Sequence, residues 1–160
     1  MATLPQLIEE DIAEITRALE ELLAKSEASA ALLIDKGGFL ITESGRSKQF
    51  DATTLAALSA ASFAATQGIA SLVSEVNFTS VYQQGETHSL LVVNVDEFCL
   101  ITVVFEAKIS VGAVKYFANT TIQEVGKQLK IAHERDPEAR LDLSVLNLAD
   151  ATPLFRRKSA

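Results

Sequence analysis

The sequence predicts an α+β fold in which helices cover one five-stranded antiparallel sheet. Three observations predict it. Apolar residues recur at helical spacing in separate segments, short runs rich in β-branched and aromatic residues lie between them, and tight turns join those runs. The expected order of elements is therefore αββαβββα. A chain of 160 residues that is 48% apolar and 22% charged has the composition of a globular domain.

The first expected helix covers residues 6–25. Its apolar residues keep the i, i+4, i+7 spacing of one helix face, and the mostly acidic opposite face is interpreted as solvated surface. The apolar face comprises Ile8, Ile12, Ile15, Leu19, Leu22 and Leu23. The runs 30–35 and 39–42 then surround Lys36-Gly37-Gly38, which predicts a hairpin. Residues 44–49 are polar, and we expect a loop there.

A second helix is expected to begin after Asp51, whose carboxylate can cap it, and to run from residue 52 to 74. Three β-rich runs follow at roughly 78–83, 89–95 and 98–105, and the short turns between them predict an antiparallel meander. The third helix is expected from residue 109 to about 134. Its inner face would comprise Val111, Val114, Phe117, Thr121, Val125 and Leu129.

The second helix is the most informative segment because it contains no charged residue. On a helical wheel one face gathers larger apolar residues, which predicts that this face lies on the sheet. That face comprises Leu55, Leu58, Ser62, Ala65, Ile69, Leu72, Val73 and Val76. The opposite face is small and uncharged; it comprises Ala56, Ala60, Phe63, Ala64, Gln67, Ser71 and Ser74, flanked by Gly68.

Four interpretations of that outer face compete. A membrane-spanning helix would contain fewer hydroxyl and amide side chains. A helix buried within the monomer would need another layer, which the remaining elements hardly supply. A solvated helix of low charge stays open as an alternative. We favour docking onto another protein surface, because small side chains allow close helix approach and a mid-helix Gly68 costs about 1 kcal/mol relative to alanine.

The strand around residues 78–84 predicts self-association. It carries neither charge nor proline to protect an exposed edge, and such edges pair with a second chain. An isologous dimer could extend the sheet through this strand and bring two uncharged helices side by side.

Composition excludes several other classes of function. The chain has 14 basic and 21 acidic residues, a net charge of −7, which argues against nucleic-acid binding. The single Cys99 excludes an internal disulfide and a thiolate zinc site, and its apolar strand predicts a core position. His88 and His133 fall on separate expected elements. We therefore expect no catalytic residue, no cofactor and no metal, and the N-terminus lacks a basic signal-peptide region, so we expect a cytoplasmic protein.

These segments resemble the Roadblock domain family, named for a dynein light chain, and within it the bacterial MglB type. The resemblance covers roughly residues 6–132. It is carried by residues 31–39, 63–72 and 82–86 and by the strand 100–105. It implies a Roadblock/profilin-like sandwich with helices on both sheet faces, assembled as a homodimer or heterodimer. The implied dimer contacts are Phe63, Phe78, Ser80 and Tyr82.

The resemblance also implies a partner and an activity. MglB-type proteins regulate a small Ras-like GTPase in cell polarity and gliding motility, and their paired second helices form a platform for it. The implied platform comprises Ala60, Ala64, Gln67, Gly68 and Ser71. Such an activator would hold the GTPase switches in their competent arrangement without inserting a residue of its own. One alternative is an arginine finger from Arg46; another is a dimeric scaffold or adaptor without GTPase activation.

Residues 1–135 are expected to form the Roadblock domain. Residues 136–160 differ in composition and are interpreted as a tail, either flexible or containing a short docking helix. The segment 154–158, Leu-Phe-Arg-Arg-Lys, could be a basic-hydrophobic docking peptide or a weak membrane contact. Three bases contribute only about 1 kcal/mol each at an anionic surface, so we expect no stable membrane anchoring.

Overall fold

The computed structural model describes residues 4–135; the expected tail lies outside the described residues. The order of elements confirms the αββαβββα prediction. The elements are α1 (Glu9–Ser26), β1 (Ala30–Asp35), β2 (Leu40–Gly45), a short 3-10 helix η1 (Ser47–Gln49), α2 (Ala52–Leu72), β3 (Ser80–Gln84), β4 (His88–Asn94), β5 (Cys99–Glu106) and α3 (Val111–Arg135).

The sheet has the strand order β2-β1-β5-β4-β3, and every neighbouring pair is antiparallel. The β1–β2 hairpin turns at Asp35, whose carboxylate accepts a hydrogen bond from the backbone N–H of Phe39 at 2.9 Å. Gly38 in this turn has φ +98°, a conformation that favours glycine. Because β1 pairs with β5, the N-terminal hairpin joins the meander of β3, β4 and β5, and β3 lies at one edge of the sheet.

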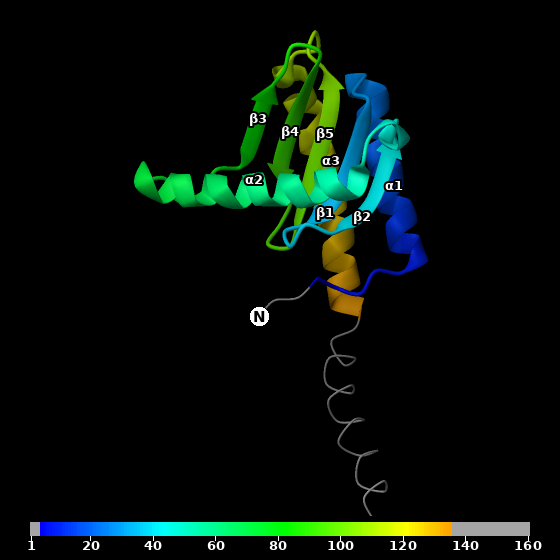
Figure 1. Cartoon of the computed structure of the whole chain (residues 1–160). Helices are drawn as coiled ribbons and strands as arrows, with labels where there is room; N and C mark the ends of the chain where they lie inside the picture. The colour runs from blue at the N-terminus through cyan, green and yellow to red at the C-terminus, as the bar shows by residue number, and fades with distance from the viewer. Residues whose placement is uncertain (1–3, 136–160) are drawn as a thin grey trace, which may run out of the picture.

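Helices cover both faces of the sheet, as expected (Figure 1). The pair α1 and α3 packs on one face over the larger core cluster, and α2 crosses the other face. Cys99 is fully buried in the larger cluster, and burial raises the pKa of its thiol to about 12. The predicted core role of this cysteine is confirmed.

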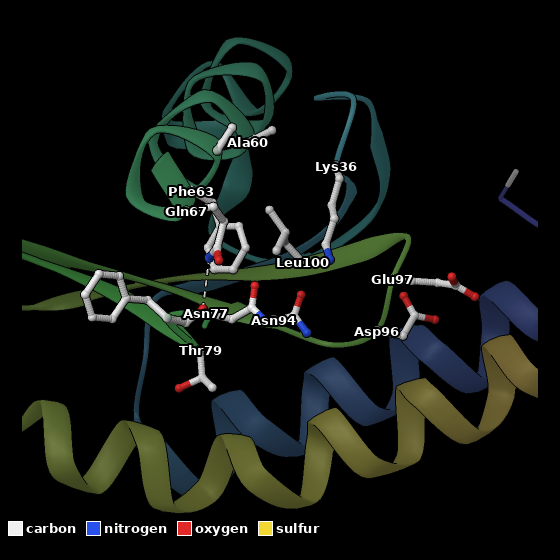
Figure 2. Close-up of a pocket in the computed structure, with 12 residues that line it drawn as sticks. Lys36, Ala60, Phe63, Gln67, Asn77, Thr79, Asn94, Asp96, Glu97 and Leu100 are labelled. Carbon is white, nitrogen blue, oxygen red and sulfur yellow. Dashed lines mark hydrogen bonds between the residues drawn. The ribbon is translucent and has the colours of Figure 1, made fainter. Parts of the chain in front are cut away.

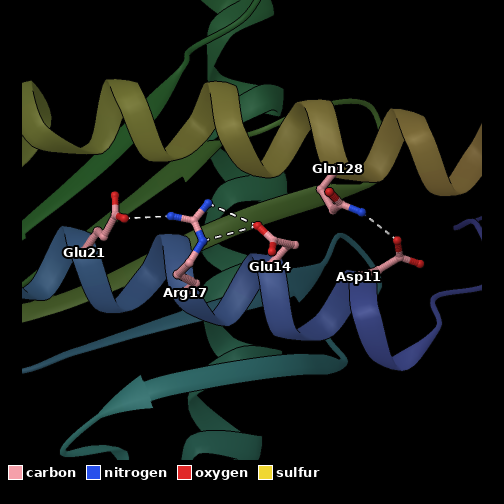
Figure 3. Close-up of polar contacts among 5 residues, drawn as sticks. All are labelled: Asp11, Glu14, Arg17, Glu21 and Gln128. Carbon is pink, nitrogen blue, oxygen red and sulfur yellow. Dashed lines mark hydrogen bonds and ion pairs between the residues drawn. The ribbon is translucent and has the colours of Figure 1, made fainter.

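A buried ionic cluster fastens the start of α1 to the end of α3. The Asp11 side chain is 0% exposed and accepts hydrogen bonds from both terminal nitrogens of Arg135 at 2.7 Å. Gln128 Nε2 donates to the same carboxylate at 2.7 Å (Figure 3), and the Ile8 backbone N–H donates at 2.9 Å. The Arg135 guanidinium holds the pKa of Asp11 well below its usual range. Nothing in the sequence pattern pointed to this cluster.

Several element ends differ from the expectation. The first helix begins at Glu9 rather than residue 6, because the Asp11 carboxylate at its third position caps the Ile8 N–H. The expected loop 44–49 contains the end of β2 and the whole of η1. The second helix ends at Leu72 rather than residue 74, and Ser74 just beyond it has φ +59°, which terminates the helical conformation.

Candidate protein-binding face

The orientation predicted for α2 is wrong. Ala56, Ala60 and Phe63, which were expected to face outward, are at most 5% exposed and pack on the sheet. Most of the larger apolar residues expected to face the sheet are exposed instead, namely Leu58, Ile69, Leu72, Val73 and Val76, at 53–85%. The reason is steric. The strands already supply bulky side chains such as Leu32 and Leu100 at this interface, so the helix presents small residues around one aromatic ring.

The outer side of α2 is a long uncharged surface. Its residues are small or apolar, and within residues 4–135 they are exposed: Ala57, Leu58, Ala61, Ala64, Ala65, Gly68, Ile69, Ser71 and Leu72. We call this set the α2 strip. A Cβ atom added at Gly68 would meet no heavy atom within 4 Å. The fold of the single chain therefore does not require a glycine at this position.

Capping fixes where α2 starts. The Asp51 carboxylate accepts hydrogen bonds from the Thr54 backbone N–H at 3.0 Å and from the Thr54 hydroxyl at 2.6 Å. These two bonds lower the pKa of Asp51. The predicted cap is confirmed.

Within residues 4–135, α2 is the one helix long and apolar enough by length and composition to cross a membrane. Its packing on the sheet through Ala56, Ala60 and Phe63 accounts for it as a helix of a folded domain.

Edge strand β3 is tied directly to α2. The Gln67 side chain donates a hydrogen bond to the Phe78 carbonyl oxygen at 2.9 Å, and Gln83 donates to the Ser62 hydroxyl at 3.3 Å. Tyr82 lies on the opposite face of the sheet, where its ring stacks on Phe105 with centroids 6.3 Å apart. The structure thus brings Gln67 of the expected platform together with Phe78 of the expected dimer contacts. Figure 1 shows the end of α2 projecting past β3.

A cleft of about 600 Å³ lies between α2, the start of β3 and the β4–β5 turn (Figure 2). It is lined by Lys36, Ala60, Phe63, Ala64, Gln67, Asn77, Phe78, Thr79, Asn94, Asp96, Glu97 and Leu100. Five residues singled out from the sequence, Ala60, Phe63, Ala64, Gln67 and Phe78, therefore share one cavity. No sequence pattern indicated that the β4–β5 turn contributes to this cleft.

Other candidate residues lie apart from this face. Arg46 follows β2 and lies before the start of α2, whereas Gly68 is about 24 Å further along the helix axis, from a rise of about 1.5 Å per residue. His88 begins β4 and His133 lies near the end of α3. Across residues 4–135 no three His, Cys, Asp or Glu side chains gather in a way that could hold a metal ion.

The fold and this face define a class of protein. Within residues 4–135, one five-stranded antiparallel sheet carries α1 and α3 on one face and α2 on the other, which is an α+β sandwich. The Roadblock/LC7 domain family model matches residues 14–105, and the chain belongs to this family.

Two solved structures of MglB are similar to the chain. Myxococcus xanthus MglB is 28% identical, with a TM-score of 0.73 over 79% of this chain and 96% of that one. A structure described as MglB with tetrameric arrangement is 29% identical, with a TM-score of 0.74 over 82% of this chain and 99% of that one. Acanthamoeba castellanii profilin IA, at 14% identity and a TM-score of 0.52, covers 71% of this chain and 97% of its own, and shares the fold alone. No curated protein sequence matches the chain.

Proposed function

We propose that the chain is a homodimeric regulator that binds a small Ras-like GTPase on the outer side of α2 and stimulates its GTP hydrolysis. The observation that carries this proposal is the α2 strip, which is long, uncharged and next to the free edge strand β3. The similarity to MglB structures, one of them a tetrameric arrangement, supports a self-associating regulator of the Roadblock type.

The proposed dimer forms through β3. Among the described strands it pairs with β4 alone, and its sequence contains neither charge nor proline. The contacts would come from Phe78, Ser80 and Tyr82, while Phe63 supports α2 from beneath. Two exposed apolar residues, Leu72 (83%) at the end of α2 and Val76 (85%) in the loop that follows, would be covered by the second copy.

The proposed platform consists of Ala64, Gly68 and Ser71 on the exposed side of α2, with the half-buried Gln67 at its border and the buried Ala60 beneath them. Helix α2 contains no Lys or Arg, so the helix itself supplies no positive charge to a γ-phosphate. The mechanism that suits it is selection of one GTPase conformation, in which the GTPase's own groups are already aligned. Small side chains and Gly68 would let the switch backbone approach closely.

The test combines a purified Ras-like GTPase with the full chain and measures binding and GTP hydrolysis. The informative variant is Gly68→Arg, whose control is Gly112→Arg, the same substitution at an exposed position of α3 on the opposite face. We expect Gly68→Arg to weaken binding at least about tenfold, or 1.4 kcal/mol, and Gly112→Arg to leave it unchanged. Binding that survives Gly68→Arg would place the platform elsewhere.

Two further measurements distinguish this mechanism from an arginine finger and from a scaffold without GTPase activation. An arginine finger supplied by Arg46 would accelerate GTP hydrolysis by about 10³–10⁵-fold. An Arg46→Ala variant that still stimulates hydrolysis would therefore exclude this mechanism. Binding without stimulation would favour the dimeric scaffold over the activator. We also propose that residues 1–135 form the Roadblock domain and that it acts in the cytoplasm.

A further inference from the structure

The proposed platform is uncharged and built from small side chains. Ala61, Ala64 and Ala65 repeat at helical spacing beside Gly68, and α2 contains no charged residue. Apolar burial is non-directional, so such a surface contributes affinity but gives little preference for one position of a partner along the helix. Charged groups across an interface fix its register and suppress wrong partners. The register of a partner bound here must therefore come from charged residues beside the helix.

Two exposed residues of opposite charge line the cleft beside the platform: Lys36 in the β1–β2 turn and Glu97 in the β4–β5 turn. Ala64 and Gln67 of the platform line the same cleft. The Lys36 ammonium lies 6.0 Å from the centroid of the Phe63 ring, and Figure 2 shows Lys36 reaching from its turn towards the cleft. In the described part of the chain neither Lys36 nor Glu97 forms an ion pair, so both charges are available to a bound protein.

Hydrogen bonds and close packing hold these two turns in place relative to α2. The Lys36 backbone N–H donates to the Phe98 carbonyl oxygen at 2.8 Å, which ties the β1–β2 turn to the β4–β5 turn. Asp96 Oδ1 accepts the Phe98 backbone N–H at 2.8 Å and shapes the β4–β5 turn. The β1–β2 turn also abuts α2, because a Cβ on Gly38 would lie 3.1 Å from Ala57 Cα. The two turns are therefore pre-organised beside the platform, which lowers the entropy cost of recognition through them.

We propose that Lys36 and Glu97 set the register of the GTPase on the platform, an inference that rests on the proposed function. Lys36 pairs with a carboxylate of the GTPase, and Glu97 pairs with a lysine or arginine of the GTPase. The matching partner therefore presents an acidic and a basic side chain next to each other at the edge of its contact with α2. A GTPase with these two charges interchanged would meet like charges and be rejected.

Charge reversal tests this assignment in a binding assay. The full chain is titrated with a purified Ras-like GTPase that is loaded with a non-hydrolysable GTP analogue. Lys36→Glu and Glu97→Lys should each weaken binding by about tenfold or more, because each places like charges at the contact. The matched controls Lys115→Glu and Glu20→Lys change the net charge equally at exposed positions of α3 and α1, over the other sheet face, and should leave the affinity unchanged.

The double variant Lys36→Glu with Glu97→Lys keeps the net charge of −7 and reverses only the positions of the two charges. It should bind as weakly as the single variants. Its loss of affinity should shrink in about 1 M salt, where the screening length falls to about 3 Å. Binding of the double variant with wild-type affinity would overturn the proposal, because net charge and not the position of each charge would then govern recognition.

Stimulated GTP hydrolysis distinguishes docking from catalysis. With Lys36→Gln the maximal rate should equal that of wild type, while the concentration needed for half-maximal stimulation rises about threefold. A lower maximal rate at an unchanged half-maximal concentration would make Lys36 a catalytic group and overturn the proposal. Weaker self-association of the Lys36 and Glu97 variants in sedimentation would also overturn it, because these residues would then contact a second copy.

Gly68→Arg in the same binding assay separates a failure of this inference from a failure of the proposed function. If Gly68→Arg abolishes binding and the Lys36 and Glu97 variants bind like wild type, the platform stands and only the register assignment is wrong. Absence of binding by the wild-type chain would refute the platform and the register assignment together.

Discussion

Replacing Gly68 with alanine tests whether the fold of the single chain or a binding partner requires a glycine at this position. The added Cβ would meet no heavy atom within 4 Å, and Gly68 carries no positive φ, so the substitution introduces no clash or backbone strain. Glycine within an exposed helix is about 0.8–1.0 kcal/mol less favourable than alanine. Gly68→Ala should therefore raise the free energy of unfolding by about 0.8 kcal/mol, which corresponds to roughly 3 °C in Tm for a domain of this size.

The assay is thermal and urea unfolding of the full chain over a range of protein concentrations. At low concentration, where monomer dominates, the variant should be more stable than wild type. If a second copy or a partner approaches Gly68 closely, the added methyl group should weaken that association, so the advantage should shrink as the concentration rises or the partner is added. Ala61→Gly, another exposed α2 position, is the matched control and should lose about 0.8 kcal/mol.

A Gly68→Ala variant that is less stable than wild type at low concentration would refute this reasoning. It would mean that the fold of the single chain requires the glycine and that its presence says nothing about a partner. A gain in stability that does not change with concentration or with added GTPase would leave the helix argument intact but would contradict a close approach at this position.

Three further predictions concern the fold and the dimer edge. Asp11→Asn should lower the free energy of unfolding at pH 7 by about 2 kcal/mol, because Arg135 loses its ionised partner. The pKa of Asp11 in the folded protein lies below the ordinary value of 3.8, so its contribution to the free energy of unfolding is present above pH 4 and is lost as the pH falls. The urea unfolding curves of variant and wild type should therefore converge towards pH 2. A stability difference that stays constant with pH would contradict this. Gly45→Ala at the end of β2 should lower the free energy of unfolding by about 2–4 kcal/mol, because φ is +88° and a Cβ would overlap backbone and side-chain atoms. A near-neutral result in urea unfolding would contradict this backbone conformation. Ser80→Lys combined with Gln84→Lys should weaken self-association about tenfold in sedimentation measurements by placing charge on the β3 edge, and unchanged association would move the interface away from β3.

The sequence predicted most of the local structure because its signals are local. The cap at Asp51 acts three residues away, and the Lys36-Gly37-Gly38 turn joins adjacent strands. The inner face of α3 also followed from spacing, since Val114 and Leu129 are buried as expected. Element ends were less accurate where an unforeseen side chain set them, as Asp11 does for α1.

The orientation of α2 could not be predicted in the same way. Its residues are small or apolar all round, so a helical wheel has no charged side to exclude from the sheet. Size alone predicts that the larger residues, such as Leu58 and Leu72, form the inner face. The side chains of the strands fill most of the interface with α2, so only small residues such as Ala56 and Ala60 fit there. The larger residues therefore face outward.

The sequence by itself determined which segments form helices and strands, and it determined that the helix after Asp51 is uncharged, because these properties depend on residues within a few positions of one another. Only the tertiary structure decided which side of that helix is open, that Asp11 meets Arg135 across 124 positions, and that Gln67 and Asn94 share a cleft. Such contacts depend on how the sheet brings distant segments together and on how much space its side chains leave, and neither quantity is recorded in a local pattern.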